Sequence, residues 1–480
     1  MGVSVPSWLR ILLVGGSIAA FGSFANADGL RVGRGAVDIT PEVGTPMLTP
    51  QTPPFEIKLA REAHDPLHVK AVVLESGGRK AAIVTCDLTS VPLAIHQAAR
   101  RAIGEATGVE PMWAMISATH NHTAPQIRAQ YVGKADEAAQ AKTAAYIEAL
   151  PGKIAEAVRL AEADLQPARA FAALGEEGSV SFNRRYFLRD GTVAANPFKG
   201  EDERLGEVLR PAGPIDPQVG VVSFAGADDV PLAMLINFAI HLDTMGGDQP
   251  SADFPFKIDE VVRAALGEAV QPMFCSGASG NINHYFLMDP ARVHRVKGEQ
   301  ESSRIGAILA AEALRALGDR ELLRDAPLRM AREQVRLEYK DDKEPAMLAR
   351  MAGSPRYFDG EVDVTNENGR LSFEAEVQVI TLGNELAWVG LPGEMFTELG
   401  MNLKNASPFR YTMIHTLANG AIGYVPNMRS YPEKAREDLA TRCASGSGER
   451  LIGAATRLLI ECKNGEPGAG TRTAAVLEEN

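Results

Sequence analysis

The segment Ala114-Met-Ile-Ser-Ala-Thr-His-Asn-His-Thr-Ala-Pro125 passes from an apolar run into two histidines, His120 and His122. The apolar residues 114–118 predict a buried β-strand. In an extended backbone, residues i and i+2 point to the same side, so both imidazoles would leave the strand end together. Zn2+ favours such nitrogen ligands at about 2.0 to 2.1 Å. The segment therefore indicates a strand-end metal site, although a bare His-x-His also occurs as an ordinary polar pair in a loop.

Three other polar residues follow apolar runs in the same way. His241 follows residues 232–240 and precedes a glycine-containing loop, Glu394 follows a Pro-Gly turn, and Tyr424 follows residues 418–423. Strand ends that meet loops are where sites gather in α/β proteins. Each residue also has an ordinary interpretation, since Glu394 could be an acid at a helix start and Tyr424 a core tyrosine with a bonded hydroxyl.

The wider pattern predicts an α/β fold, in which a mixed β-sheet is flanked by helices and the metal site lies at strand ends. Short apolar runs at 70–75, 81–85 and 114–118 predict strands. Apolar residues at three and four spacing predict helices at 93–107, 138–163, 256–266, 303–317 and 449–462. Residues 196–217 and 353–370 are polar and rich in Pro and Gly, which favours long surface excursions. Without an internal repeat, we expect one catalytic domain over residues 28–480.

The charge of the chain argues against two classes of partner. Over 480 residues the net charge is -12, with no cluster of Lys and Arg. Nucleic acids and anionic lipid surfaces bind basic patches, so neither is expected as a partner. Any contact with a membrane would be apolar and transient.

The first 27 residues have the features of a signal peptide. A short, weakly basic start ends at Arg10, an apolar run covers residues 11–21, and Ala25-Asn26-Ala27 provides a small-x-small cleavage site before Asp28. A buried N-terminal helix is the alternative, since the apolar run is too short to cross a bilayer. No later stretch has 18 uninterrupted apolar residues, so we expect export to a periplasm or the exterior without stable membrane insertion.

Four cysteines are too few for a disulfide scaffold and lack the CxxC spacing of a thiolate zinc site. Cys86 and Cys275 lie in apolar runs, which predicts core positions. Cys443 and Cys462 flank a predicted helix, and an oxidising compartment would permit their pairing. Sequence cannot supply the geometry of that bridge, so it stays an open hypothesis.

Taken in order, these segments resemble the N-terminal catalytic domain of the neutral/alkaline, non-lysosomal ceramidases. The resemblance runs from Gly35-Ala-Val-Asp-Ile-Thr-Pro41 to the last predicted helix. The blocks that carry it are His64-Asp-Pro-Leu67, residues 117–125, Phe182-Asn-Arg184, Ser251-Ala-Asp-Phe-Pro255, Gly280-Asn-Ile-Asn283, Pro392-Gly-Glu394 and residues 419–431.

The resemblance implies a zinc amidohydrolase that acts on linear amides. It assigns Zn2+ as the cofactor, held by His120, His241, Glu394 and Tyr424. It also places His122 and Arg184 beside the scissile amide. Ceramide or a related N-acyl lipid would be cleaved into a fatty acid and a sphingoid base by attack of a metal-activated water.

The sequence departs from the family pattern at two positions. Asn283 stands where characterised ceramidases carry a serine near the amide, which argues against a serine nucleophile here. Arg436 stands twelve residues after Tyr424, where ceramidases carry a tyrosine that contacts substrate, so a more polar or anionic ligand is conceivable. The immunoglobulin-like C-terminal domain of larger ceramidases is also not expected, because the chain ends soon after its last apolar helix.

Chemistry suggests roles for the residues around the expected metal. His122 could act as a general acid or base, or hold a developing oxyanion, and Arg184 could stabilise that oxyanion. Metal-bound imidazoles usually donate their second N–H to a carboxylate or a carbonyl, and Asp87 and Asp253 are candidate carboxylates, although each could equally be a turn or cap acid. His284 could line the pocket. Structural roles are expected for the remaining histidines, which are His64, His68, His96, His294 and His415.

Three functions remain open from sequence. The first is zinc-dependent hydrolysis of ceramide or a related N-acyl lipid. The second keeps the zinc chemistry but acts on another N-acyl amine, a glycan or a cell-wall amide, as Asn283 and Arg436 suggest. The third is a non-catalytic exported binding protein with the same fold.

Overall fold

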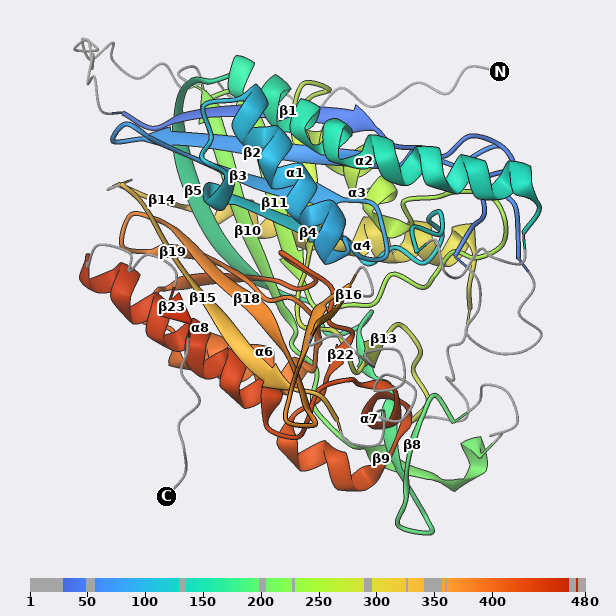
Figure 1. Ribbon diagram of the computed structural model, residues 1–480. Helices are drawn as coiled ribbons and strands as arrows, with labels where there is room; N and C mark the ends of the chain where they lie inside the picture. The colour runs from blue at the N-terminus through green and yellow to red at the C-terminus, as the bar shows by residue number, and fades with distance from the viewer. Residues whose placement is uncertain are drawn as a thin grey trace, which may run out of the picture.

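The structure, a computed structural model, describes residues 29–48, 57–128, 135–197, 204–226, 229–288, 296–324, 327–340, 356–358, 361–465 and 472–473. The expected signal peptide, residues 1–27, lies outside the described residues. Figure 1 shows two large sheets with helices on the outer side of each. The architecture is therefore mixed α/β, as the sequence predicts.

Within the described residues, nine strands form a mixed sheet in the order β12-β11-β10-β5-β1-β2-β3-β4, with β14 paired to β5. Most neighbours are antiparallel, but β3 and β4 are parallel, as are β11 and β12. The β1–β5 link contains only two residue pairs, so a short contact joins the two halves of the sheet. The strands are β1 (Arg31–Asp38), β2 (His68–Ser76), β3 (Arg79–Cys86), β4 (Ala114–Ala118), β5 (Gln166–Glu176), β10 (Gln218–Gly226), β11 (Pro231–Phe238), β12 (Gln271–Ser276) and β14 (Glu321–Leu322).

A second sheet of seven described strands has the order β16-β17-β18-β15-β23, with β19 paired to β18 and β21 paired to β19. Its inner face packs against the first sheet, because Trp388 and Met413 share one buried cluster with Ile83 and Ile116. The two sheets therefore enclose a common core. The strands are β15 (Leu328–Glu338), β16 (Arg356–Phe358), β17 (Asp363–Glu367), β18 (Arg370–Leu382), β19 (Leu386–Gly390), β21 (Tyr411–His415) and β23 (Arg472–Thr473).

Helices cover the outer faces of both sheets (Figure 1). Helix α2 packs on β1 and β2 with α1 beside it, while α3 and α4 pack on β5, β10 and β12. Helix α8 packs on β15 and β18 of the second sheet, and α6 contacts α8. The described helices are α1 (Leu93–Ala106), α2 (Glu137–Ala163), α3 (Phe254–Leu266), α4 (Glu299–Gly318), α6 (Thr397–Ala406), α7 (Arg436–Ala440) and α8 (Ser447–Asn464).

Two glycines explain why α2 lies so close to β1. A Cβ on Gly33 would come within 2.0 Å of the Ala161 carbonyl oxygen, and one on Gly35 within 2.3 Å of the Ala157 carbonyl oxygen. Such contacts are far below van der Waals separation. The backbone of α2 can therefore pack this closely against β1 only because Gly33 and Gly35 have no side chain.

Short sheets join the loops at the strand ends. Strand β20 pairs in parallel with β22, β13 pairs with β6, and β7 pairs with β8 and β9. These pairings bring together segments that are far apart in the sequence. The strands are β6 (Phe182–Asn183), β7 (Arg185–Leu188), β8 (Val193–Ala195), β9 (Val208–Pro211), β13 (Ile282–Asn283), β20 (Glu394–Met395) and β22 (Tyr424–Val425).

The helices predicted from periodicity are all present. The described residues 204–217 are mostly exposed or half-buried, as expected of a surface excursion, whereas the expectation is wrong for residues 361–370, where Val362 and Val364 are buried in the core. Strand β9 belongs to a three-stranded sheet, and β16 and β17 extend the second large sheet. Both segments pair through backbone hydrogen bonds, which do not require the apolar period that the sequence lacks.

All four cysteines are buried free thiols in the structure. The hypothesised bridge between Cys443 and Cys462 is therefore not formed. Cys86 and Cys275 lie in the cores, as predicted, and burial raises the pKa of both thiols.

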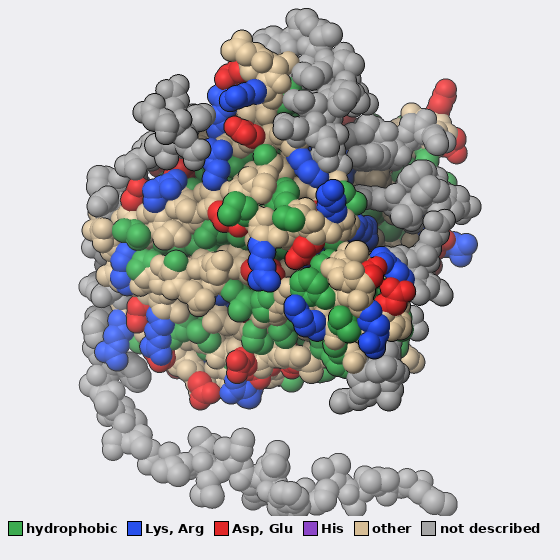
Figure 2. Space-filling view, turned by 90° about the horizontal axis from the view of Figure 1, so that it is seen from below, with side chains coloured by type: hydrophobic (Ala, Val, Ile, Leu, Met, Phe, Trp, Pro, Cys, Tyr) green, Lys and Arg blue, Asp and Glu red, His purple; other side chains and the backbone are tan. Residues whose placement is uncertain are grey.

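Acidic and basic side chains are interspersed on the face shown in Figure 2, with only small apolar groups between them. This distribution agrees with the absence of a basic cluster in the sequence. Among the described helices, none combines the length and apolarity needed to cross a bilayer.

Candidate metal centre

His120 lies two residues beyond β4 with a backbone φ of 72°. This left-handed conformation is uncommon for a residue with a side chain, although histidine tolerates it better than most. The backbone is held by a hydrogen bond from the His120 N–H to the Leu88 carbonyl at 3.0 Å. The ring is held by Nδ1, which donates to the Thr89 carbonyl at 2.8 Å. Because Nδ1 carries the proton, Nε2 presents a free lone pair.

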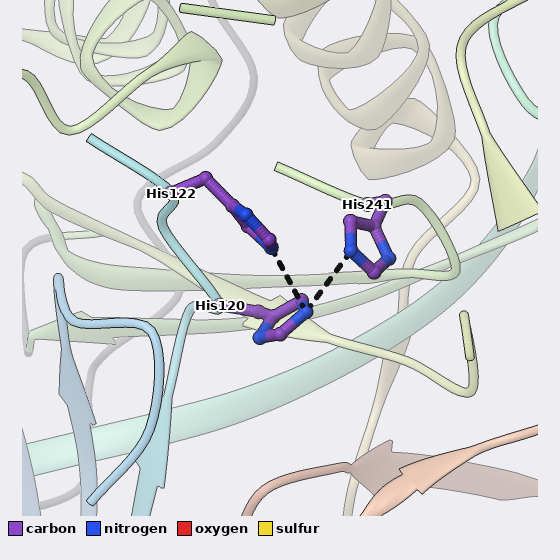
Figure 3. A group of neighbouring side chains, drawn as sticks. All are labelled: His120, His122 and His241. Carbon is purple, nitrogen blue, oxygen red and sulfur yellow. Dashed lines mark hydrogen bonds between the residues drawn. The ribbon is translucent and has the colours of Figure 1, made fainter. Parts of the chain in front are cut away.

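Two further imidazoles face His120 Nε2 (Figure 3). His241 Nε2 lies 3.1 Å from it and His122 Nε2 lies 3.3 Å from it. The loops that carry these rings are joined directly, since the His122 N–H donates to the Leu242 carbonyl at 3.2 Å. The predicted convergence of His120 and His241 is therefore present, and His122 belongs to the same cluster, which could hold a metal ion.

Their surroundings keep His122 and His241 neutral. Burial lowers the pKa of His122 to about 3 and holds the pKa of His241 well below its ordinary value, with the neighbouring His120 adding to both shifts. His241 Nδ1 faces the Ser279 carbonyl at 3.4 Å, which directs its Nε2 lone pair into the cluster. Neutral rings with converging lone pairs are the form that binds a metal.

Glu394 brings a carboxylate to the histidines. It begins β20 directly after Gly393, and its Oε2 lies 3.2 Å from His120 Nε2. That oxygen is buried and accepts no hydrogen bond from the described residues. Burial alone would raise the pKa of this carboxyl, but the adjacent His120 and the Arg184 guanidinium lower it below the usual value. An ionised, unsatisfied oxygen at this place is what a cation would require.

Tyr424 is the register partner of Glu394, because β22 runs parallel to β20. The Arg184 guanidinium lies over its ring, 5.3 Å from the centroid. Burial and the Glu394 carboxylate raise the pKa of the Tyr424 hydroxyl to about 12. Tyr424 thus lies beside Glu394, with its ring against Arg184.

Arg184 is buried next to this cluster and held on two sides. Its Nε donates to Glu437 Oε1 at 2.8 Å and its Nη2 donates to the Gly280 carbonyl at 2.6 Å. Glu437, which is fully buried, also accepts from Arg185 Nη1 at 3.2 Å. Burial would lower the pKa of Arg184, but Tyr424 and Glu437 raise it, so the arginine is a fixed cation.

Of the two residues that depart from the family pattern, Asn283 is buried and Arg436 is exposed. Asn283 Nδ2 donates to Asn196 Oδ1 and its Oδ1 accepts from the Tyr285 N–H at 2.9 Å, so this buried side chain is engaged on both ends. Arg436 is the exposed first residue of α7. The positive charge of Arg436 is close enough to act against the rise in the Tyr424 pKa, but the Arg436 side chain is exposed and lies outside the buried cluster.

Of the two interpretations of Asp87 and Asp253, the structure does not support an acceptor of an imidazole N–H, whereas Asp253 is the N-cap of α3, as the alternative stated. Asp87 Oδ2 accepts from the His68 N–H at 2.9 Å, and Asp253 Oδ2 accepts from the Thr244 N–H at 2.9 Å. The imidazole Nδ1 atoms face the carbonyls of Thr89 and Ser279 instead. Backbone carbonyls have no signature in a sequence, so periodicity and spacing could not have identified these partners.

The distances from His120 Nε2 to its neighbouring donor atoms are those expected between two ligands of one zinc ion. Two nitrogens and one carboxylate oxygen surround His120 Nε2 at 3.1, 3.3 and 3.2 Å. Ligands at about 2.0 to 2.1 Å in a tetrahedron are separated by about 3.3 Å. A cavity of about 410 Å³ has Pro392 and Ile422 in its lining but none of these donors.

The fold and this cluster together describe a two-sheet α/β protein with a candidate metal centre at its strand ends. Its structure is similar to that of the neutral ceramidase from Pseudomonas aeruginosa, with a TM-score of 0.70 and 18% identity over 94% of this chain and 77% of that chain. A structure of a ceramidase complexed with C2 matches with a TM-score of 0.71 and 18% identity, over 94% of this chain and 78% of that chain. The chain therefore has the fold of the neutral ceramidases, as the resemblance implies.

No family model matches the sequence, and no curated protein matches it.

Proposed function

We propose that this chain is an exported zinc amidohydrolase that cleaves the amide of ceramide or a related N-acyl lipid, giving a fatty acid and a sphingoid base. The observation that carries the proposal is the convergence of three imidazole Nε2 atoms and the unsatisfied Glu394 Oε2 beside the buried Arg184. The fold it shares with neutral ceramidases supports the choice of an N-acyl lipid.

In this proposal His120, His241, Glu394 and Tyr424 hold the ion. Zn2+ would supply a Lewis acid and lower the pKa of a coordinated water to near 7. His122 is the group assigned to move a proton, because its Nε2 borders the ligand His120 at 3.3 Å and this proposal does not use it as a ligand. Arg184 presents a fixed positive charge where an oxyanion would develop. Asn283 would contribute a polar pocket wall rather than a nucleophile, since an amide cannot attack a carbonyl.

Metal removal tests the proposal directly. We expect the purified protein to contain about one zinc per chain, as a single tetrahedral site requires. Hydrolysis of a ceramide panel, measured as released fatty acid, should disappear after chelation and return with added Zn2+. Protein without zinc and without turnover would instead be a binding protein, and a zinc protein that turns over no ceramide would support the alternative below.

Arg436 favours a second candidate substrate, an N-acyl amine that carries an anionic group. Arg436 is exposed and forms no ion pair with any residue that the structure describes. The next residue, Glu437, binds Arg184, and the Thr441 hydroxyl of the same segment donates to the Tyr424 carbonyl at 2.7 Å. Helix α7 therefore holds an uncompensated cation close to the candidate centre.

Substitution Arg436→Tyr separates the two substrates. For an N-acyl amino acid, we expect kcat/KM to fall about tenfold relative to a neutral ceramide of equal acyl length, as for the loss of one charge-assisted hydrogen bond. Arg436→Lys keeps the charge and is the matched control, with a smaller change. Equal selectivity in all three proteins would remove Arg436 from substrate recognition.

A further inference from the structure

The segment Ser251-Ala252-Asp253, called here the 251–253 clamp, lies between the two loops that carry the histidines. On one side, Asn121 Nδ2 donates to the Ser251 carbonyl at 2.6 Å and the Ser251 N–H donates to the Thr123 carbonyl at 3.2 Å. Asn121 and Thr123 flank His122, so the clamp is bonded to the loop of His120 and His122.

On the other side, the Asp253 carboxylate holds the loop that follows His241. Its Oδ2 accepts from the N–H groups of Thr244 at 2.9 Å and Met245 at 3.0 Å, and its Oδ1 accepts from the Thr244 hydroxyl. Asp253 is buried, with 1% of its surface exposed. Without this carboxylate, buried backbone donors in the His241 loop would lack partners.

Asp65 fixes the clamp from behind. Its Oδ2 accepts from the Ser251 hydroxyl at 2.5 Å and its Oδ1 accepts from the Ala252 N–H at 2.6 Å. His64 Nδ1 contacts the same carboxylate at 2.8 Å. The clamp therefore has hydrogen-bond partners on three sides and little freedom to shift.

The backbone of Asp253 is strained, with φ 62° and ψ -154°. This region is populated almost only by glycine, and a side-chain residue remains there only when its surroundings determine the conformation. Glycine would fit this backbone more easily. An aspartate at a backbone position that suits glycine points to a use for its carboxylate.

We propose that Asp253 is a positioning residue for the metal centre. Its carboxylate fixes the loop after His241 while the clamp fixes the loop of His120 and His122, and the His122 N–H to Leu242 carbonyl bond closes the connection. The spacing of the Nε2 atoms thus depends on Asp253, although it touches none of them. This inference rests on the proposed zinc site.

The test compares Asp253→Gly and Asp253→Asn with the wild-type chain. Glycine adopts this backbone without strain but removes the carboxylate, whereas asparagine keeps the shape and loses the charge. We expect both variants to bind Zn2+ about 10- to 100-fold more weakly in a chelator competition, the usual effect of losing a partner behind a metal ligand. The Co2+ absorption spectrum should also change, because the ligand geometry loosens.

Thermal unfolding of the metal-free proteins distinguishes positioning from general stabilisation. Glycine relieves the strain, so the positioning role predicts a larger loss in metal affinity than in stability for Asp253→Gly. Glu333→Gln is the control, since Glu333 is a buried acid paired with Arg457 at 2.7 Å in the second sheet, and it should bind metal normally. Wild-type affinity and spectrum in the Asp253 variants would overturn the inference, whereas a wild-type chain that binds no metal would overturn the proposed function itself.

Discussion

Replacement of His120 by asparagine is expected to abolish metal binding and reduce kcat/KM for amide hydrolysis by at least about a thousandfold. The His120 Nε2 atom is the one that lies within 3.1 to 3.3 Å of His241, His122 and Glu394, so its loss removes the centre of the cluster. A Lewis acid contributes several kcal/mol to such a reaction, and each 1.36 kcal/mol is a factor of ten. Metal content and released fatty acid measure the two effects.

Asparagine is preferred to alanine here because it tolerates the left-handed backbone that His120 adopts. A loss of activity then reflects the missing ligand rather than backbone strain. His68→Gln is the matched control, because His68 begins β2 and its side chain is not a member of the cluster. Zinc-dependent hydrolysis that survives in His120→Asn would contradict the assigned centre.

Replacement of Glu437 by glutamine should lower the free energy of unfolding by about 3–5 kcal/mol, the cost of leaving a buried charge without its partner. Glu437 is fully buried and accepts hydrogen bonds from both Arg184 and Arg185. The amide of glutamine would direct N–H groups at guanidinium donors. Urea denaturation measures the loss, and hydrolysis should fall with it because Arg184 is no longer held over Tyr424.

Glu156→Gln is the comparison for this stability effect. Glu156 pairs with Arg159 on the exposed face of α2, where water screens the pair and little stability depends on it. Its unfolding midpoint should match that of the wild-type chain. If Glu437→Gln were as stable as Glu156→Gln, the buried network would not support the fold.

The sequence predicted the helices and strands in which buried residues recur with a regular helical or strand spacing. The expected strand 114–118 coincides with β4, and the expected helix 93–107 differs from α1 by one residue. Predicted starts were late where the first turn carries no apolar residue, as in α4, which begins at Glu299 rather than at residue 303. The short helix α7 was missed because five residues cannot show a helical period.

The site was predictable only in part from the residues themselves. The spacing of His120 and His122 predicts a pair of histidines at a strand end. The local sequence gives no sign that Glu394 lies near them, because its distance from His120 depends on how the two sheets pack. The family resemblance supplied that connection. For Asp253, the structure supports the helix-cap interpretation, since its carboxylate accepts from backbone N–H groups and the Thr244 hydroxyl rather than from an imidazole.

The candidate donors come from both layers of the molecule, with His120 and His241 following strands of the first sheet and Glu394 following β19 of the second. An ion bound there would couple the stability of the fold to the concentration of free metal, because the donors meet only when the two sheets are packed together. Free zinc at a thousand times its dissociation constant would add about 4 kcal/mol to the stability of the native state. Resistance to proteases would then rise and fall with the zinc content of the surroundings.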